Sequence, residues 1–535
     1  MSDSRNVRMR IQDLRVALAE DGQEILKGVS VELEAGRIFA LVGESGSGKS
    51  VTSMAAMRLL PEALEITSGS VQVGEQDLFD LSESAMQSVR GRRVAMIFQN
   101  AMTALNPVQT VGQQVAETLR LHTALRGDAL RERVVQLFDE VGIPDPAQRF
   151  SFYPHQLSGG QQQRVMIAMA LACEPEILIA DEPTTALDVT IQEQVLELIR
   201  ELTQSRQLAV LLITHDMGVV RNTADDVGVM YRGEIIERAS VDDFFHNPKE
   251  DYSRKLIDAL PDLTHFQSAA TEEPLLQLEE VKVHFPIRKG VLQRTVDYTR
   301  AVDGVSLNIG RAETYALVGE SGSGKSTLGR AILNLESIAG GRVQFNGEEI
   351  QHLDRKAMLP FRKQIQVIFQ NPYSSMNPRL TVGEIISEGM VSLGLGLSKE
   401  ERDKRIDELL TRVQLGPEYA SRYPHEFSGG QLQRIAIARA LAVEPELIIC
   451  DEPTSALDVS IRAEVLDLLQ ELQRDFGVSY LFITHDLSIV PSLAHHVGVM
   501  QLGKLVEQGS AEQILTNPQH PYTQALLASV PRIDP

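Results

Sequence analysis

The chain has 535 residues, of which 51 are Lys or Arg and 73 are Asp or Glu, so its formal net charge is −22 at pH 7. This length exceeds what a single hydrophobic core serves, and two or more domains are therefore expected. The acidic balance argues against nucleic acid as a main partner, because a phosphate backbone requires a basic binding surface.

The two cysteines, Cys173 and Cys450, fall one in each half of the chain, each within an apolar run. Their spacing fits neither a disulfide framework nor a metal site, so we expect buried thiols in a reducing compartment. No apolar run reaches the about 20 residues that cross a bilayer, and the first residues lack the apolar stretch of a signal peptide. We therefore expect a cytosolic chain that contacts a membrane only through a partner.

The first motif in chain order is a glycine-rich loop between a predicted strand and a predicted helix. The apolar run 39–42 leads into residues 43–50, which read Gly-Glu-Ser-Gly-Ser-Gly-Lys-Ser. They fit G-x-x-x-x-G-K-[ST], in which backbone N–H groups surround phosphates and the lysine reaches the terminal ones. The same letters recur at 319–326 after the apolar run 316–318, which makes a chance match a poor explanation.

Residues 82–150 lack the short apolar runs found elsewhere, so we predict a helical subdomain without strands, inserted in a sheet domain. Gln99 follows the strand-like residues Met-Ile-Phe within this segment. Beyond it, the stretch Ser-Gly-Gly-Gln at 158–161 precedes an apolar helix. Serine is a good helix N-cap, and glycines would let a phosphate approach the exposed N–H groups. An ordinary capped helix explains one such copy equally well.

Two carboxylates follow the predicted buried strand 177–180, at Asp181 and Glu182. At the carboxyl end of a strand, the Asp could hold Mg²⁺ through water and the Glu could polarise an attacking water. His215 follows the next buried strand, 210–213, after a Thr and before an Asp. A single histidine in this position is usually a structural residue. Repetition of the whole series in the second half favours a functional role.

The second half repeats every one of these features in the same order and at nearly constant separation. The repeated residues are Lys325, Gln370, Ser428, Gly429, Gly430, Gln431, Asp451, Glu452 and His485. Each half is long enough for a complete domain. We predict a first domain at 1–262, a linker at 263–274, where the apolar periodicity breaks down, and a second domain at 275–535.

This set of motifs resembles the nucleotide-binding domain of ATP-binding-cassette (ABC) transporters, twice over nearly the whole chain. The resemblance implies two tandem P-loop NTPase domains of the α/β class. Each would have a mainly parallel sheet core, an antiparallel β-subdomain and an inserted α-helical subdomain. It also implies that the halves pack head to tail as an internal pseudo-dimer, with each ATP between the Walker A loop of one half and the signature of the other.

The resemblance assigns roles to the motif residues of both halves. Glu182, Glu452, His215 and His485 would be catalytic, and Ser50, Gln99, Asp181, Ser326, Gln370 and Asp451 would hold Mg²⁺. ATP would be bound by two phosphate loops and two signatures: Gly43, Glu44, Ser45, Gly46, Ser47, Gly48, Lys49, Ser50, Val51, Gly319, Glu320, Ser321, Gly322, Ser323, Gly324, Lys325, Ser326, Thr327, Ser158, Gly159, Gly160, Gln161, Ser428, Gly429, Gly430 and Gln431. Asp188 and Asp458 match the D-loop.

Departures from the family pattern are few. Phe427 replaces the usual leucine of the signature, which should alter packing and leave the phosphate contact unchanged. Leu18 stands where an adenine-stacking aromatic residue is expected in the first half. In the second half Phe285 and Tyr298 are both candidates for that residue, because an insertion around 286–296 obscures the correspondence.

A finer resemblance is to the ATPase subunits of oligopeptide and dipeptide importers, fused into one chain as in microcin C-type importers. It rests on the Asn-Pro stretches 99–107 and 370–378, on Tyr-Pro-His at 153–155 and 423–425, and on the tail 517–523. It implies an ATP-hydrolysing motor on the cytoplasmic side of the membrane. The implied partners are two permease subunits and an external solute-binding protein. The alternative is a double-cassette ATPase that acts on ribosomes, although such proteins normally carry a long charged linker.

Overall fold

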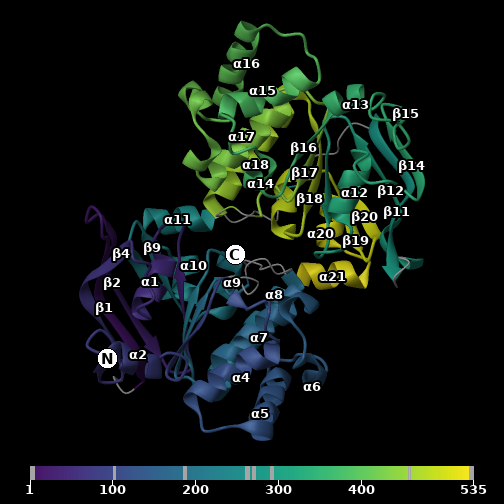
Figure 1. Cartoon of the computed structure of the whole chain (residues 1–535). Helices are drawn as coiled ribbons and strands as arrows, with labels where there is room; N and C mark the ends of the chain where they lie inside the picture. Colours follow the sequence, from purple (N-terminus) through teal and green to yellow (C-terminus); the bar gives the residue numbers. More distant parts are fainter. Residues whose placement is uncertain are drawn as a thin grey trace. The chain divides into compact units, whose positions relative to one another are not determined.

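The computed structural model describes residues 6–99, 104–184, 189–258, 266–267, 273–289, 294–455, 457 and 459–528. The chain divides near residue 260 into two compact units, which repeat one sequence of elements (Figure 1).

A six-stranded sheet with strand order β10-β9-β3-β8-β7-β6 forms the centre of the first unit. All neighbours pair in parallel except β10, which runs antiparallel to β9. Every residue of β3, β7 and β8 is buried, which explains why these strands read as continuous apolar runs. The strands are β3 (Ile38–Val42), β6 (Val94–Ile97), β7 (Ile177–Asp181), β8 (Ala209–Ile213), β9 (Asp226–Tyr231) and β10 (Glu234–Ser240).

A second, antiparallel sheet with order β2-β1-β4-β5 packs on one face of the central sheet. Alternate residues of a strand point to opposite faces. Accordingly Ile177 and Ile179 join the core beneath the antiparallel sheet, whereas Leu178 and Ala180 face the helices. The strands are β1 (Val7–Leu18), β2 (Glu24–Glu34), β4 (Leu64–Val73) and β5 (Gln76–Asp77).

The helices α4, α5 and α7 share an apolar core with the other face of the sheet, and Figure 1 shows them together, away from β1, β2 and β4. Val115, Phe138 and Ile167, one from each helix, are fully buried in this core. The helices of the unit are α1 (Lys49–Ala56), α2 (Glu83–Val89), α4 (Val111–His122), α5 (Gly127–Glu140), α6 (Pro146–Arg149), η1 (Pro154–Gln156), α7 (Gly159–Leu171), α8 (Val189–Arg206), α9 (Met217–Thr223), α10 (Val241–His246) and α11 (Asp251–Asp258).

The prediction that residues 82–150 contain no strand is wrong, because β6 lies within them. Val94 pairs with Ile177 and Ile97 with Ala180, so β6 is the edge strand of the central sheet. Three of its four residues are buried. A run this short carries too little periodicity to be distinguished from the helical segments around it.

The second unit has the same two sheets, with strand orders β16-β17-β18-β13-β19-β20 and β12-β11-β14-β15. Its strands are β11 (Pro274–Lys289), β12 (Arg294–Gly310), β13 (Thr314–Val318), β14 (Gly340–Phe345), β15 (Glu348–Glu349), β16 (Ile365–Ile368), β17 (Leu447–Asp451), β18 (Ser479–Thr484), β19 (His496–Gln501) and β20 (Lys504–Ser510). Two tandem α/β domains of the predicted class are thus confirmed.

The helices of the second unit follow the order of the first. They are α12 (Lys325–Ile332), α13 (Leu359–Gln364), α14 (Pro372–Ser375), α15 (Val382–Ser392), α16 (Lys399–Arg412), η2 (Pro417–Ser421), η3 (Pro424–Glu426), α17 (Gly429–Leu441), α18 (Val459–Phe476), η4 (Leu487–Ile489), α19 (Val490–Leu493), α20 (Ala511–Thr516) and α21 (Pro521–Ala528). None of the helices in the described ranges is both long and apolar enough for a membrane span.

Candidate functional site

Each glycine-rich loop connects the central strand of its sheet to a helix, as the sequence predicts. Residues 43–50 lie between β3 and the first turn of α1, and residues 319–326 lie between β13 and α12. Gly43 has a φ of 151°, and a Cβ there would lie 2.2 Å from the carbonyl oxygen of Met230. Gly319 has a φ of 147° and would meet the carbonyl oxygen of Met500 at the same distance. Only glycine fits where the loop begins.

The two loop lysines are almost fully buried and held in the same way. The Nζ of Lys49 donates to the carbonyl oxygens of Gly43 and Glu44 at 2.7 and 2.9 Å. In the second unit the Lys325 Nζ lies 2.6 and 2.8 Å from the corresponding carbonyl oxygens of Gly319 and Glu320. The loop therefore positions its own cation next to the helix N-terminus, a combination suited to a phosphate.

The first carboxylate of each acidic pair is hydrogen-bonded to the serine that ends the loop. The Ser50 hydroxyl donates to Asp181 Oδ1 over 3.0 Å, and the Ser326 hydroxyl donates to Asp451 Oδ1 over 2.7 Å. Burial raises the pKa of both aspartates, and the serine hydrogen bond partly opposes that rise. A buried anion that needs compensation in this way is a fitting ligand for a cation.

The second carboxylate of each pair is reached by a glutamine and a histidine. Glu182 Oε2 accepts from Gln99 Nε2 at 2.7 Å, and its Oε1 lies 2.9 Å from His215 Nδ1. In the second unit Gln370 Nε2 lies 2.8 Å and His485 Nδ1 lies 3.3 Å from Glu452 Oε2. Burial opposes ionisation of Glu452, but the hydrogen bonds and charges of His485, Lys325 and Gln370 together outweigh it and lower the pKa of Glu452.

The backbone at both glutamates is unusual. Glu182 and Glu452 have φ angles of 45° and 48°, in the left-handed region that side chains rarely adopt. The amide of each donates to the end of the neighbouring strand, to Ile213 and Ile483, at 2.9 Å. Such strain persists where the surrounding structure imposes it, and it is common at functional sites. Here it turns the carboxylate from the end of the strand towards the glutamine and histidine.

The Ser-Gly-Gly-Gln stretches form capped helix starts, at α7 and α17. Ser158 Oγ accepts from the Gln161 amide at 3.3 Å, and Gln161 Oε1 accepts from the Ser158 amide at 3.2 Å. Ser428 and Gln431 form the same two hydrogen bonds. A Cβ on Gly160 would lie 2.5 Å from Ile191 Cγ2 of α8, and one on Gly430 would meet Ile461 at 2.5 Å. The second glycine of each stretch is thus required for close helix packing, a reason that the sequence did not indicate.

Phe427, just before the second of these stretches, is buried and stacks edge to face against Tyr419 at 5.5 Å. The Tyr373 hydroxyl, from the Asn-Pro stretch 370–378, donates to the Phe427 carbonyl oxygen over 3.1 Å. The corresponding Leu157 is also buried. The substitution is accommodated by aromatic packing. Asp188 and Asp458, predicted from the family resemblance, lie outside the described residues.

Strand register relates the candidate adenine-stacking positions of the two units. Val16 pairs with Leu26 in the first unit and Val283 pairs with Val302 in the second. Two residues further along each strand lie Leu18 and Phe285. Phe285 is 39% exposed, and Tyr298, on the opposite strand, is 53% exposed. Register therefore favours Phe285 over Tyr298 as the counterpart of Leu18.

Sequence reasoning missed two residues that contact the loops. The hydroxyl of Tyr252, on α11, accepts from the Glu44 amide at 3.2 Å. The hydroxyl of Tyr522, on α21, accepts from the Glu320 amide at 3.1 Å. The Asn-Pro and Tyr of the tail 517–523 recur in the first half as Asn247-Pro248 and Tyr252, which was the available signal, but nothing local connects these residues with the loops.

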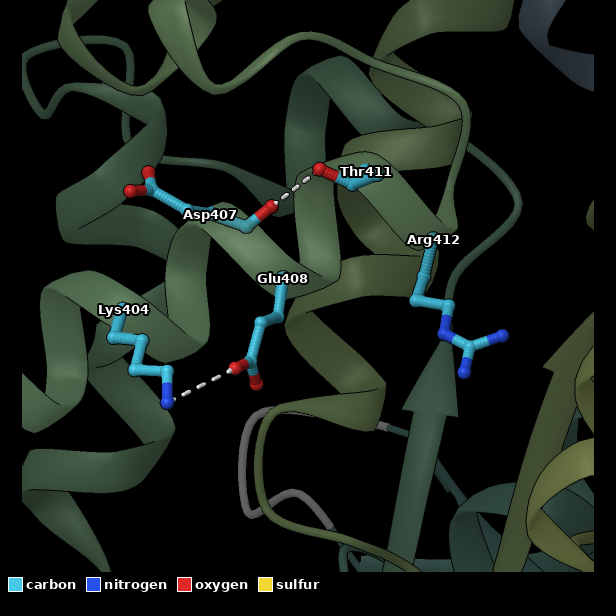
Figure 2. Close-up of a pocket in the computed structure, with 5 residues that line it drawn as sticks. All are labelled: Lys404, Asp407, Glu408, Thr411 and Arg412. Carbon is cyan, nitrogen blue, oxygen red and sulfur yellow. Dashed lines mark hydrogen bonds and ion pairs between the residues drawn. The ribbon is translucent and has the colours of Figure 1, made fainter.

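A separate surface hollow on α16, of about 370 Å³, is lined by Lys404, Asp407, Glu408, Thr411 and Arg412 (Figure 2). Lys404 pairs with Glu408 over 3.8 Å, and the Thr411 hydroxyl donates to the Asp407 carbonyl of the same helix. Arg412 points away, to Asp475 at 2.7 Å. These groups are engaged with one another along a helix surface and do not converge on a ligand.

Comparison with known proteins agrees with this geometry. The family model "ABC transporter" matches residues 26–185 and 302–455, and the model "Oligopeptide/dipeptide transporter, C-terminal region" matches 236–281 and 506–535. The chain is 47% identical to the glutathione import ATP-binding protein GsiA of Salmonella paratyphi A, over 100% of this chain and 91% of that protein. It is also 47% identical to the peptidoglycan transport ATP-binding protein YejF of Agrobacterium fabrum, over 98% of this chain and 97% of that protein.

Proposed function

Because this chain belongs to the ATP-binding subunits of ABC transporters, we propose that it powers the import of a peptide-like solute through membrane permeases. The observation that carries this proposal is the matched pair of sites. Each unit brings a lysine, a serine, an acidic pair, a glutamine and a histidine together with nearly the same distances. Among the described residues, both sites keep every group to which the mechanism below assigns a role.

In the proposed mechanism, the loop amides and the lysine of each unit bind the β- and γ-phosphates of ATP. Glu182 and Glu452 orient the attacking water and accept its proton. His215 and His485, each hydrogen-bonded to its glutamate, hold that carboxylate in place and donate towards the γ-phosphate. Gln99 and Gln370 contact the same carboxylates from just beyond the edge strands β6 and β16.

The residues around each loop fit Mg²⁺, which prefers oxygen ligands and is commonly held by one or two carboxylates together with phosphates. Ser50 and Asp181, or Ser326 and Asp451, lie within hydrogen-bonding distance of each other at the loop. The side-chain oxygen of Gln99 or Gln370 would complete the set. The ion would neutralise charge developing on the phosphates.

The solute class follows from the C-terminal regions and the relatives. Both halves match the oligopeptide/dipeptide transporter model, and the relatives are named for glutathione and peptidoglycan, two molecules that contain peptide bonds. We therefore propose a short peptide or peptide conjugate as cargo. Two permeases would bring the chain to the cytoplasmic face of the membrane, and an external binding protein would deliver the solute.

Uptake by cells that lack the gene tests this proposal. Cells complemented with the unaltered chain should take up labelled glutathione or a muropeptide, and cells with the Glu182→Gln, Glu452→Gln double variant should not. Labelled maltose is the control. Sedimentation of the chain with ribosomes, and not with membranes that contain its permeases, would instead support the ribosomal alternative.

A further inference from the structure

The tyrosines Tyr252 and Tyr522 contact the phosphate loops at one particular peptide unit. The Gly43 carbonyl and the Glu44 amide belong to the same planar peptide group. Its oxygen accepts from Lys49 Nζ at 2.7 Å, and its N–H donates to the Tyr252 hydroxyl at 3.2 Å. A rotation of this plane therefore moves the oxygen that holds the lysine. The tyrosine hydroxyl opposes such a rotation.

The second unit repeats the arrangement. The Gly319 oxygen accepts from Lys325 Nζ at 2.6 Å, and the Glu320 N–H donates to the Tyr522 hydroxyl at 3.1 Å. The two residues of this contact are 208 positions apart in the sequence of the first unit and 202 positions apart in the second. Because the same atoms meet at nearly the same distance in both units, this contact is a common feature of the fold of each unit.

A carboxylate, buried in the first unit and half-buried in the second, binds the backbone just before the helix that carries each tyrosine. Glu237 of β10, 6% exposed, accepts from the amides of Lys249 and Glu250 at 2.9 and 3.1 Å. These amides immediately precede α11, whose second residue is Tyr252. In the second unit Glu507 accepts from the amides of Gln519 and His520 at 2.7 and 3.1 Å, just before α21 and Tyr522. An anion at a helix start stabilises that helix.

We infer that Tyr252 and Tyr522 are positioning residues, through which the C-terminal region of each unit sets the orientation of the loop peptide and thereby of the phosphate-binding lysine. This inference rests on the proposed role of Lys49 and Lys325. It gives the oligopeptide-type C-terminal regions a function in nucleotide affinity. A change in the position of α11 or α21 would reach the loop through one hydrogen bond.

The Tyr252→Phe, Tyr522→Phe double variant of the full-length chain removes both hydroxyls and keeps both rings. One lost hydrogen bond to each loop should weaken binding of a fluorescent ATP analogue by about three- to tenfold. The KM for ATP should rise to the same extent, and kcat at saturating ATP should change less than twofold. The matched control is Tyr231→Phe, because the Tyr231 ring packs against Tyr252 at 4.4 Å, yet its hydroxyl has no bond to the described part of the loop.

A chain that lacks both loop lysines distinguishes a positioning role of the tyrosines from a general weakening of nucleotide binding. In a Lys49→Ala, Lys325→Ala chain, the Tyr→Phe changes should cause no further loss of nucleotide affinity. If the tyrosines act only through the lysines, the effects of the two sets of substitutions are not additive. An equal, additive loss in this background, or unchanged affinity in the original one, would overturn the inference. Full affinity in the lysine variant alone would instead contradict the proposed role of the loops.

If the tyrosine variant does not fold, Glu237→Gln with Glu507→Gln gives the decisive measurement. This pair weakens the helix start without altering the loop or the tyrosine. A smaller rise in the KM for ATP, with kcat retained, is expected. An unchanged KM in this folded variant would count against the inference.

Discussion

The two units differ at the start of the strand that leads to the phosphate loop, where that strand meets its neighbour. In the first unit the Ile38 amide donates to Asp225 Oδ2 at 2.8 Å, and Arg37 pairs with Asp226 at 2.9 Å. In the second unit the Thr314 amide donates to His495 Nδ1 at 3.0 Å, and Glu313 lies 2.6 Å from His496. Strand register places these residues in equivalent positions.

The comparison shows which parts of a duplicated site can diverge. An amide at a strand start needs an acceptor, and a carboxylate or a neutral imidazole serves equally well. The acidic and basic partners beside it have exchanged positions, so that in the second unit the acid, Glu313, directly precedes the loop strand. Around the phosphate loop, in contrast, each group must meet a fixed partner, and the two units keep the same residues.

The largest expected effect comes from the two glutamates. Glu182→Gln with Glu452→Gln should lower phosphate release at saturating ATP by about 100-fold or more, because general-base catalysis contributes that much. The amide keeps the shape of the side chain, so ATP binding should be retained. Each single variant measures how much turnover its unit supports. Normal turnover in the double variant would show that another group orients the water.

Next in size is the loss of the first loop glycine. Gly43→Ala and Gly319→Ala should each weaken ATP binding at least tenfold, because the new Cβ would lie 2.2 Å from a carbonyl oxygen. Gly46→Ala and Gly322→Ala are the controls. Their φ angles are also positive, but no atom of the described residues lies within 4 Å of the added Cβ, so a cost of only about 1 kcal/mol is expected. Equal effects at the two positions, measured by nucleotide titration and thermal unfolding, would contradict the steric argument.

A smaller effect tests the difference between Leu18 and Phe285. Phe285→Leu should weaken ATP binding at the second unit about fivefold, through the loss of a stacking surface for adenine. Leu18→Phe should strengthen binding at the first unit. Titration with ATP and with inorganic triphosphate distinguishes contacts to the adenine base from contacts to the phosphates, since the substitutions should change the affinity for ATP and leave the affinity for triphosphate unchanged. Tyr298→Leu serves as the control, and a larger effect there would make Tyr298 the stacking residue.

The smallest effect concerns pH and His495. Burial lowers the pKa of His495, partly offset by Glu313, so the folded chain resists protonation more than the unfolded chain does. The unfolded state then binds more protons below the ordinary histidine pKa of about 6.5, and stability falls as pH decreases through that range. His495→Asn keeps an acceptor for the Thr314 amide but does not titrate. The variant should lose less stability than the unaltered chain between pH 7.5 and 5.5, as measured by unfolding in urea; an equal loss would refute this role.

Local sequence determined the duplicated order of motifs, the strand–loop–helix setting of both phosphate loops and the capped starts of α7 and α17. These features depend on glycines, caps and apolar runs whose partners lie within a few residues, so the sequence exposes them directly. The segment 82–150 was predicted to lack strands although residues 96–98 are strand-like, because a run of four residues beside helices carries too little periodicity to identify the edge strand β6.

Only the tertiary structure brought Gly160 against Ile191 and placed Tyr252 and Tyr522 on the phosphate loops. It also showed, through the strand register within each unit, that Leu18 and Phe285 occupy equivalent positions. Each of these relations joins elements that are distant in the chain. They arise from how helices and strands pack once the cores are formed. A pattern of residue types constrains its own neighbourhood, whereas the partner of a hydroxyl some 200 residues away is decided by the fold.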